Sequence, residues 1–448
     1  MVAELAGYIE SKRVEFIGPN AIKPMRIAIA APLRTVVGGA ETYLRALMPA
    51  LMSRGHQVAL LYEQDAGDSR MHVDVGLDIP KWQLRRDGHL PPGLVQWRPD
   101  VVYAQGLGFA EAEDALLDAY PAALFVHAHR GTCISGSKAH AFPQMRECER
   151  TLGPGCLAYY FVRRCGGLNP VTTASLYARE RGHKRRMARY RAVFVASRHM
   201  EHELVHNGIP GRYIHRNPIP PYQAVPVARP PQEQPWTDTI LYVGRLVRSK
   251  GCHHLIEAMP RVRAALRRPL RLIVAGAGPM EEELQAQARR TDADIEFISW
   301  VDARTRQALM EAADLLVLPT LMPETFGMVG VEAGCAGLPT VAYAMGGVAE
   351  WLEPGVSGEF ASADPPTSSS LAEAMVRALR DPEHHLRLRH GAWEMARIIT
   401  AEAHSTRLEK VLERIARPSE TPMIPKRKVV RLDLVQDYIP SLFEFRTR

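Results

Sequence analysis

Short runs of β-branched and other apolar residues alternate with amphipathic helical patterns over most of this 448-residue chain. The first run begins at Met25 and reads MRIAIAAP. In the segment after it, Leu44, Leu47, Met48 and Leu51 recur at helical spacing, which predicts an amphipathic helix. Strands that alternate with helices form right-handed βαβ units and a mostly parallel sheet. The alternation therefore predicts an α/β fold.

A proline-rich stretch interrupts the alternation. Residues 218–235 contain seven prolines. Proline at this density fits neither a helix interior nor a strand interior, so we predict a semi-rigid linker. The alternation restarts at TILYVGRL (239–246) and continues to PTVAYAM (339–345). Two α/β domains joined by a linker form a cleft, and ligands of such sheets bind beyond the carboxyl ends of the strands.

These patterns predict a division of the chain into five parts. The first domain includes a cysteine-containing insert, residues 131–170. The parts are an N-terminal extension (1–24), a first α/β domain (25–217), the linker (218–235), a second α/β domain (236–400), and a C-terminal helix and tail (401–448) that the sequence does not place.

The composition is that of an ordinary globular protein, with 46% hydrophobic and 23% charged residues. It excludes a disordered, collagen-like or disulfide-scaffold protein. The chain contains no apolar run long enough to span a membrane. Its first residues include Glu4, Glu10, Lys12 and Arg13 and lack the apolar region of a secretory signal, so we expect a cytoplasmic protein. The net charge of +7 indicates an anionic partner, such as a phosphate, a lipid headgroup or a nucleic acid.

The segment VGRLVRSKG (243–251) places two cations beyond the end of a predicted strand. Arg245 and Lys250 lie on the same loop and could converge on one pair of phosphates, since arginine offers a bidentate fork and lysine a point charge. The alternative is that both are solvated surface residues.

The segment PETFGMVGVEAGCAG (323–337) follows a predicted strand and opens a helix. The amides at such a helix start have no helical partner and favour a phosphate or a polar sugar group. We expect Glu332 to lie about two turns into the helix, on the same face as Glu324. The alternative is two unrelated surface glutamates, although an unpaired carboxylate buried among these apolar neighbours would be costly.

Two glycine-containing turns also follow strands. Gly38 and Gly39 in VVGGAE (36–41) would let the backbone approach a ligand closely. The turn VAGAGPM (274–280) is similar, but the chain has no complete G-x-G-x-x-G, so neither turn is a dinucleotide fingerprint.

Together and in this order, GGAE, VGRL…KG, VAGAGP and the E-x7-E of PETFGMVGVE resemble the retaining nucleotide-sugar glycosyltransferases of family 4. The resemblance runs from about residue 25 to about residue 397 and is strongest over 237–360. It implies the GT-B architecture, in which two Rossmann-like domains face each other across a cleft. It also implies a nucleotide-sugar donor held mainly by the second domain.

The resemblance assigns the main donor contacts to the second domain. Arg245 and Lys250 would bind the diphosphate. Glu324, together with the backbone amides of Phe326 and Gly327, would hold the donor sugar.

The remaining contacts implied by the resemblance come from both domains. Glu332 would bind the ribose, and Gly38 and Gly39 would line the phosphates from the first domain. In the segment FVHAHRGTC, His127 matches the histidine that faces the donor sugar and acceptor, whereas His129 could be a surface residue. An unperturbed imidazole titrates near neutrality, so either histidine could move a proton.

The mechanism predicted from these residues is metal-independent transfer with retention. Arg245, Lys250 and the helix start would stabilise the departing nucleoside diphosphate in place of a divalent metal, with His127 and Glu324 completing the catalytic set. The closest match to a metal-binding Asp-x-Asp is residues 292–294, which we interpret as a solvated turn. We expect a UDP- or GDP-sugar donor, no required cofactor and, on the resemblance, a hexosyltransferase of polysaccharide or glycoconjugate biosynthesis with a saccharide or lipid-linked acceptor.

Four of the six cysteines lie within 33 residues, at Cys133, Cys148, Cys156 and Cys165. One hypothesis is a structural metal site of thiolates, with His140 as a further possible ligand. A second is one or two disulfides, which a reducing cytoplasm disfavours. A third is four unlinked cysteines that pack as small hydrophobic residues. The other two, Cys252 and Cys335, are expected to pack only.

A basic stretch, RERGHKRRMARYR (179–191), contains seven cations and one acid. It could rest on an anionic membrane surface and hold the enzyme near a lipid-linked acceptor, or it could be a solvated basic helix. Nucleic acid is disfavoured as a partner because Tyr190 is the only aromatic residue in the stretch.

Two other functions fit the same fold class. One is a sugar-nucleotide epimerase, which also has two facing Rossmann-like domains. The other is a catalytically idle interaction protein with the cysteine insert as its functional part. The joint presence of Arg245, Lys250, Glu324 and Glu332 argues against the idle protein.

Overall fold

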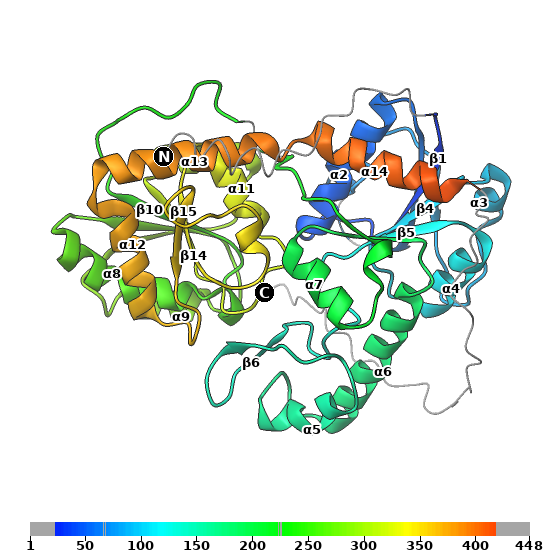
Figure 1. The fold of residues 1–448 in the computed structure, drawn as a ribbon, viewed down its shortest axis with the longest axis horizontal. Helices are drawn as coiled ribbons and strands as arrows, with labels where there is room; N and C mark the ends of the chain where they lie inside the picture. The colour runs from blue at the N-terminus through cyan, green and yellow to red at the C-terminus, as the bar shows by residue number, and fades with distance from the viewer. Residues whose placement is uncertain (1–22, 66, 68, 223, 225, 418–448) are drawn as a thin grey trace.

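The computed structural model describes residues 23–417 except residues 66, 68, 223 and 225. The predicted extension (1–24) and the end of the predicted tail (417–448) lie almost entirely outside the described residues. The described chain forms two lobes, each with a twisted sheet covered by helices (Figure 1).

The first lobe contains a seven-stranded sheet in the order β3-β2-β1-β4-β5-β8-β9, and each pair of neighbours is parallel. Its strands are β1 (Arg26–Leu33), β2 (Gln57–Gln64), β3 (Lys81–Gln83), β4 (Val101–Ala104), β5 (Ala122–Phe125), β8 (Ala192–Val195) and β9 (Ile214–Arg216). The helices are α2 (Gly39–Ser53), α3 (Pro92–Trp97), α4 (Ala110–Ala119), α6 (Pro170–Met187) and α7 (Arg198–His206), with short 3-10 turns η1 (Ser69–Met71) and η2 (Gly211–Tyr213).

The second lobe contains a six-stranded parallel sheet in the order β12-β11-β10-β13-β14-β15. Its strands are β10 (Thr239–Val243), β11 (Arg271–Ala275), β12 (Asp294–Ile298), β13 (Leu315–Leu318), β14 (Thr340–Tyr343) and β15 (Gly358–Ala361). The helices are α8 (Cys252–Leu266), α9 (Glu281–Ala288), α10 (Ala303–Ala312), α11 (Met328–Cys335), α12 (Ser368–Arg380) and α13 (Pro382–Ile398), with 3-10 turns η3 (Arg248–Lys250) and η4 (Gly347–Glu350). The two parallel sheets confirm the predicted α/β fold; the domain limits themselves stay predictions.

The proline-rich segment and the last helix tie the lobes together. Val227 in the segment donates its N–H to the carbonyl of Cys335 and accepts a hydrogen bond from the indole of Trp393. Helix α14 (Ala401–Ala416), which the sequence did not place, crosses back onto the first lobe (Figure 1). There Arg54 pairs with Glu409 at 2.5 Å, so the chain ends its described part on the domain where it began.

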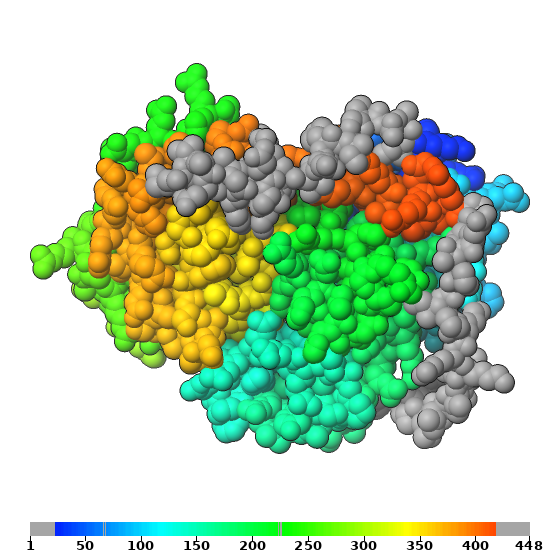
Figure 2. Space-filling model, viewed as in Figure 1, coloured from blue at the N-terminus to red at the C-terminus, as the bar shows by residue number. Residues whose placement is uncertain are grey.

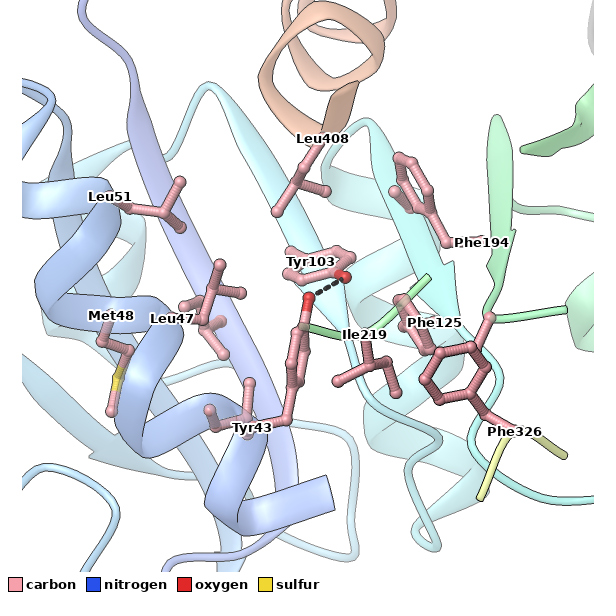
Figure 3. Packing of buried hydrophobic residues seen from close by; sticks show 14 of the residues in the cluster. Tyr43, Leu47, Met48, Leu51, Tyr103, Phe125, Phe194, Ile219, Phe326 and Leu408 are labelled. Carbon is pink, nitrogen blue, oxygen red and sulfur yellow. Dashed lines mark hydrogen bonds between the residues drawn. The ribbon is translucent and has the colours of Figure 1, made fainter. Parts of the chain in front are cut away.

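The core of the first lobe extends to its border with the second. Tyr43 and Tyr103 are buried in it and share a hydrogen bond of 2.8 Å, because a buried hydroxyl needs a partner (Figure 3). Phe125 and Phe194 lie beside them, and Phe326 reaches this cluster from the second lobe. The lobes therefore share apolar packing as well as a chain connection.

The cysteine insert forms a small unit against both lobes (Figure 2). It contains the antiparallel pair β6 (Ala139–His140) and β7 (Arg146–Glu147), followed by α5 (Gly155–Val162). Arg146 forms an ion pair of 2.9 Å with Asp364 of the second lobe. The insert is thus in contact with both sides of the interdomain border.

The basic stretch is partly neutralised by acids on α4. Arg186 pairs with Glu113 at 2.6 Å, and Arg189 pairs with Asp118 at 2.8 Å. Tyr190 is buried and donates to Glu113 at 2.7 Å. Among the described residues, no helix combines the length and hydropathy that crossing a membrane requires.

Candidate active site

A cavity of about 650 Å³ lies between the two lobes, where the carboxyl ends of both sheets face each other. Both lobes supply predicted site residues to its wall. They are Gly38, Gly39 and His127 from the first lobe and Arg245, Lys250, Glu324, Phe326 and Gly327 from the second. The structure therefore brings together eight of the nine residues predicted to contact the donor or to act in catalysis.

In the second lobe, the loop that carries Arg245 is held by backbone contacts with the neighbouring loop. The N–H of Gly244 donates to the carbonyl oxygen of Ala275, and the N–H of Leu246 donates to the carbonyl oxygen of Ala277. A Cβ atom on Gly276 would lie 1.9 Å from the Gly244 carbonyl oxygen, so only glycine fits there. The VAGAGP turn thus supports the Arg245 loop.

A second glycine fixes the position of Lys250. Gly251 follows η3 with a φ of +69°, and a Cβ atom there would lie 1.8 Å from the carbonyl oxygen of Pro319. Leu321 also donates its N–H to Ser249 at 2.8 Å. The loop is therefore pressed against the end of β13, and this contact carries Lys250 to the loop that holds Glu324.

Lys250 and Glu324 form a short ion pair. The Thr320 hydroxyl donates to the same Glu324 oxygen at 3.0 Å. Arg245 lines the same cavity and is exposed, and within the described part of the chain its side chain makes no ion pair. Two cations beside one carboxylate leave this wall with a net positive charge, which favours a diphosphate.

The two predicted glutamates do not share a helix face, so that expectation was wrong. Gly327, with a φ of +80°, caps α11, and Glu324 lies before the helix in an isolated bridge to Gly346. Glu332 is therefore only about one turn into α11.

Glu332 does not line the cavity; it is buried and pairs with Arg306 at 3.1 Å. Burial raises the pKa of Glu332, and the Arg306 charge opposes that rise. Pairing with Arg306 thus explains how a carboxylate is tolerated among apolar neighbours. Its predicted contact with a ribose stays a prediction.

On the first-lobe wall, His127 is fixed by its neighbours. Its Nε2 lies 2.8 Å from the amide oxygen of Gln105, and its ring stacks on Phe125 with centroids 4.6 Å apart. Burial, with smaller contributions from Arg130 and His404, lowers the pKa of His127 to about 3. His127 is thus not an unperturbed imidazole, and at neutral pH it is a neutral hydrogen-bonding group; its catalytic role stays a prediction.

His129 is also not the surface residue that we considered. It is 2% exposed, and its Nε2 lies 3.2 Å from the Pro323 carbonyl of the second lobe. Burial lowers the pKa of His129 to about 4. His129 thus serves as a contact between the lobes and not as a wall of the cavity.

Two further polar contacts cross the border beside the cavity. The Thr325 hydroxyl donates to the carbonyl of His127 at 3.1 Å, and the Ser197 hydroxyl donates to the carbonyl of Thr325 at 2.6 Å. Neither residue was predicted, because an isolated Ser or Thr beyond a strand has no distinctive spacing. They hold the loop of Glu324 against the loop of His127.

Arg130 is a cavity residue that the motifs did not indicate. It lines the cavity from the first lobe, and its guanidinium donates to the carbonyl of Gly106 at 2.7 Å. Its place in the HAHRG segment, directly after the two histidines, was the available signal. It adds a cation opposite Arg245 and Lys250.

The four insert cysteines line a second cavity of about 280 Å³. All six cysteines are free, and Cys252 and Cys335 are buried in the second lobe as expected. Burial raises the pKa of Cys165 to about 11, with smaller contributions from the nearby Cys148, Cys133 and Cys156. In the described part of the chain, no three His, Cys, Asp or Glu side chains stand close enough to hold one metal ion.

Residues 229–395 match the family model described as Glycosyl transferases group 1. An uncharacterized glycosyltransferase of Methanocaldococcus jannaschii is 34% identical over 144 residues, which are 32% of this chain and 36% of that protein. Glycogen synthase of Mycobacterium tuberculosis is 28% identical over 383 residues, which are 78% of this chain and 84% of that protein. The chain thus matches only about a third of the first relative but most of the second.

The solved structures extend the likeness to both lobes. Anabaena Alr3699/HepE in complex with UDP-glucose has a TM-score of 0.58 at 19% identity, and it covers 86% of this chain and 99% of its own. Sucrose-phosphate synthase from Thermosynechococcus elongatus has a TM-score of 0.62 at 18% identity, with coverage of 87% and 99%. These matches confirm the GT-B fold. The family model and the relatives confirm glycosyltransferase as the enzyme class. Membership of family 4 and retention stay predictions.

Proposed function

We propose that the chain transfers a sugar from a UDP- or GDP-sugar to a hydroxyl acceptor with retention of configuration. The observation that carries this proposal is the meeting of two unlike walls at one cavity. Arg245, Lys250 and the start of α11 line one side, and His127 lines the other. A diphosphate fits the positive wall, which leaves the transferred sugar facing His127.

The second-lobe wall stabilises the leaving group in this proposal. When the bond between the anomeric carbon and the phosphate oxygen breaks, negative charge develops on the nucleoside diphosphate. Arg245 and Lys250 then offset that charge, together with the amides of Phe326 and Gly327. Binding of the donor draws Lys250 from Glu324 to the phosphate, and this frees Glu324 to accept hydrogen bonds from sugar hydroxyls.

The first-lobe wall positions the acceptor. The acceptor oxygen attacks the anomeric carbon from the side on which the diphosphate leaves, and its proton passes to the departing phosphate oxygen. His127 is neutral at working pH because burial lowers its pKa to about 3. It therefore orients a hydroxyl by hydrogen bonding and does not take up the proton.

Donor identity can be tested by thermal shift of the full chain with UDP, GDP, ADP and the corresponding sugar nucleotides, all with excess chelator. A ligand that binds only the folded state raises the melting temperature by mass action. We expect UDP or GDP, with its sugars, to stabilise the protein under these conditions. If stabilisation and turnover were both lost with chelator and restored by magnesium, the metal-independent mechanism would be contradicted.

Reaction class is tested by NMR of the donor and product. Retention predicts that the first product has the same anomeric configuration as the donor sugar. If the intact donor were isomerised without any acceptor, the epimerase would be the better assignment. Binding of the donor without any turnover over a wide acceptor panel would favour the idle interaction protein.

The acceptor side of the proposal is a saccharide or lipid-linked hydroxyl in polysaccharide or glycoconjugate assembly, with a cytoplasmic location. Residues 179–191 could also contact a membrane surface. The ion pairs of Arg186 and Arg189 with acids of α4 argue against this contact, whereas the exposed Arg181 and Arg185 are available for it. Flotation with anionic vesicles tests it: a protein that stays at the bottom of the gradient has no such contact.

A further inference from the structure

The cysteine insert has too little apolar core to explain its order by burial alone. Its apolar cluster has four buried residues, of which Ile134, Leu152 and Tyr160 belong to the insert and Tyr177 comes from α6. Several large apolar side chains remain exposed in or beside it, with Val162 at 62% and Leu168 at 74%. Units with so small a core are usually stapled by disulfides or by a metal. No disulfide is present in the described residues.

The four thiols come from four different parts of the insert and meet at one cavity of about 280 Å³. Each cysteine is fixed by a hydrogen bond from its own backbone N–H. The acceptors are the carbonyls of His129 for Cys133, Lys138 for Cys148, Gly153 for Cys156 and Tyr160 for Cys165. The four are only partly buried, whereas Cys252 and Cys335, which pack as small hydrophobic residues, are fully buried.

The cavity wall carries more positive than negative charge. Lys138, Arg150 and Arg163 line it, against a single acid, Glu149. Lys138 is 1% exposed, although it pairs with Glu203 at 2.6 Å. Lys138 already has Glu203 as its partner, Arg163 is half-buried and Arg150 is exposed, so the wall is positive but holds no buried unpaired cation. Four thiolates around a divalent centre carry a net negative charge, so the wall complements a thiolate-bound metal.

We infer that Cys133, Cys148, Cys156 and Cys165 hold a thiophilic metal centre that staples the insert. On binding, each thiol loses its proton and the thiolate sulfur donates an electron pair to the metal. Two centres share this chemistry: a single zinc ion and a polynuclear iron–sulfur core.

The arrangement favours the iron–sulfur core of the two. No three of the described ligating side chains are close enough for one ion, so a single zinc would need the thiols to draw together. A polynuclear core spreads its cysteine ligands further apart and fits a cavity of this size better.

The place of the insert gives the centre a structural role beside the cleft. Cys133 is six residues beyond His127 in the same loop. The insert also reaches the second lobe, through the Arg146–Asp364 ion pair. A staple at the thiols therefore supports both the loop of His127 and one contact between the lobes.

The test is elemental analysis of the full chain purified without oxygen and without added metal. We expect either about one zinc per chain, or several irons with a matching amount of acid-labile sulfide and a visible charge-transfer absorption. Either result supports the inference and identifies the centre. A folded protein with neither metal above trace level, or with the four thiols joined as disulfides, would overturn it.

Two variants and a control localise the metal. Cys156→Ser and Cys165→Ser each remove one ligand, and we expect both to lose most of the bound metal. The control is Cys252→Ala, which removes a buried thiol of the second lobe, 1% exposed, and should leave the metal content unchanged. Retention of full metal content by both serine variants would show that the metal binds elsewhere and would contradict the assignment. Hydrogen exchange then separates loss of the staple from global unfolding. Loss of the staple should speed exchange only in peptides from residues 131–170, whereas global unfolding would speed it throughout the chain.

Discussion

The two walls of the interdomain cavity are built by different means. The second-lobe wall consists of loops held by backbone contacts that only glycine allows, at Gly251 and Gly276. The first-lobe wall consists of side chains that hold one another: the half-buried His127 is bonded to Gln105 and stacked on Phe125, both of which are buried. The first construction offers cations and backbone amides, and the second offers the His127 imidazole beside one cation, Arg130.

This difference matches the two halves of the proposed reaction. The nucleoside diphosphate is the charged part of the substrates, and rigid loops with cations suit it. The sugar and the acceptor are neutral, and a neutral imidazole can orient their hydroxyls without a charge of its own. The contrast predicts that the second wall is sensitive to charge and backbone changes, whereas the first is sensitive to protonation.

Acidification should have the largest effect and should act first on the first lobe. Burial lowers the pKa of seven histidines in this lobe, its insert and helix α14. The pKa of His140 is lowered, and six others fall to about 3 or 4, namely His127, His129, His183, His199, His215 and His404. The second lobe has three with a lowered pKa, His253, His254 and His385.

Because these histidines stay neutral in the folded state, the unfolded chain binds more protons below its ordinary pKa of about 6.5. Stability is therefore complete above that pH and falls as the pH drops from about 6.5 toward 4, by at most ~1.4 kcal/mol per pH unit for each fully buried histidine. Hydrogen exchange at decreasing pH should show the first lobe opening before the second. A melting temperature that does not change between pH 7.5 and pH 5 would contradict this prediction.

Lys250→Met should have the next largest effect. It removes one of the two cations proposed to stabilise the leaving group, so transfer should slow by roughly 100- to 1000-fold. The matched control is Arg248→Met, since Arg248 is exposed on the same 3-10 turn and does not line the cavity. Steady-state rates of donor turnover measure both. If both variants had equally small effects on the rate, Lys250 would have no part in stabilising the leaving group.

Gly251→Ala tests whether the second wall depends on its backbone contacts. Both Gly251 and Gly355 have a positive φ, +69° and +75°, so alanine at either costs about 1 kcal/mol of backbone strain. Only Gly251 would also place its Cβ 1.8 Å from a carbonyl oxygen, whereas Gly355 has open space around it. Urea unfolding should therefore show Gly251→Ala to be less stable than Gly355→Ala by about 2 kcal/mol or more. Equal losses would mean that the loop relaxes freely.

A pair of Tyr→Phe variants should have the smallest effects, and it compares a core tyrosine of the first lobe with a cavity-lining tyrosine of the second. The Tyr43 hydroxyl bonds Tyr103 at 2.8 Å and His404 at 2.9 Å, so Tyr43→Phe should cost about 1–2 kcal/mol of stability. Tyr43 does not line the cavity, so donor affinity should be unchanged.

Tyr242 lines the cavity and donates to the carbonyl of Arg245 at 3.0 Å. Tyr242→Phe should therefore weaken donor binding as well as stability. Calorimetric titration with the donor separates the two variants. A loss of affinity in Tyr43→Phe, with none in Tyr242→Phe, would contradict donor binding at the second-lobe wall.

The sequence predicted the regular part of the molecule well for a physical reason. Apolar runs such as 57–63 and 315–320 form strands inside the sheets, and most of their side chains are buried. Such a run can be recognised from its own residues, without knowledge of distant segments. The edge strands β3 and β9 have only three residues each, which is too short to show a period, so they were not predicted.

The site was predictable where a loop motif follows directly from a strand. Arg245, Lys250 and Glu324 reach one cavity because the carboxyl ends of parallel strands lie at one edge of the sheet. The protonation of His127 and the burial of His129 were not predictable, since both depend on residues of distant segments. The same is true of the Arg306 partner of Glu332 and of the return of α14 to the first lobe.

The most direct test of the account is a calorimetric titration of UDP and GDP into the full chain with excess chelator. We predict that one of them binds wild type and Arg248→Met with similar affinity, and that Lys250→Met and Arg245→Met each bind it at least about tenfold more weakly. If neither nucleotide bound without a divalent metal, or if the two cavity variants bound as tightly as wild type, the positive wall would not be the diphosphate site.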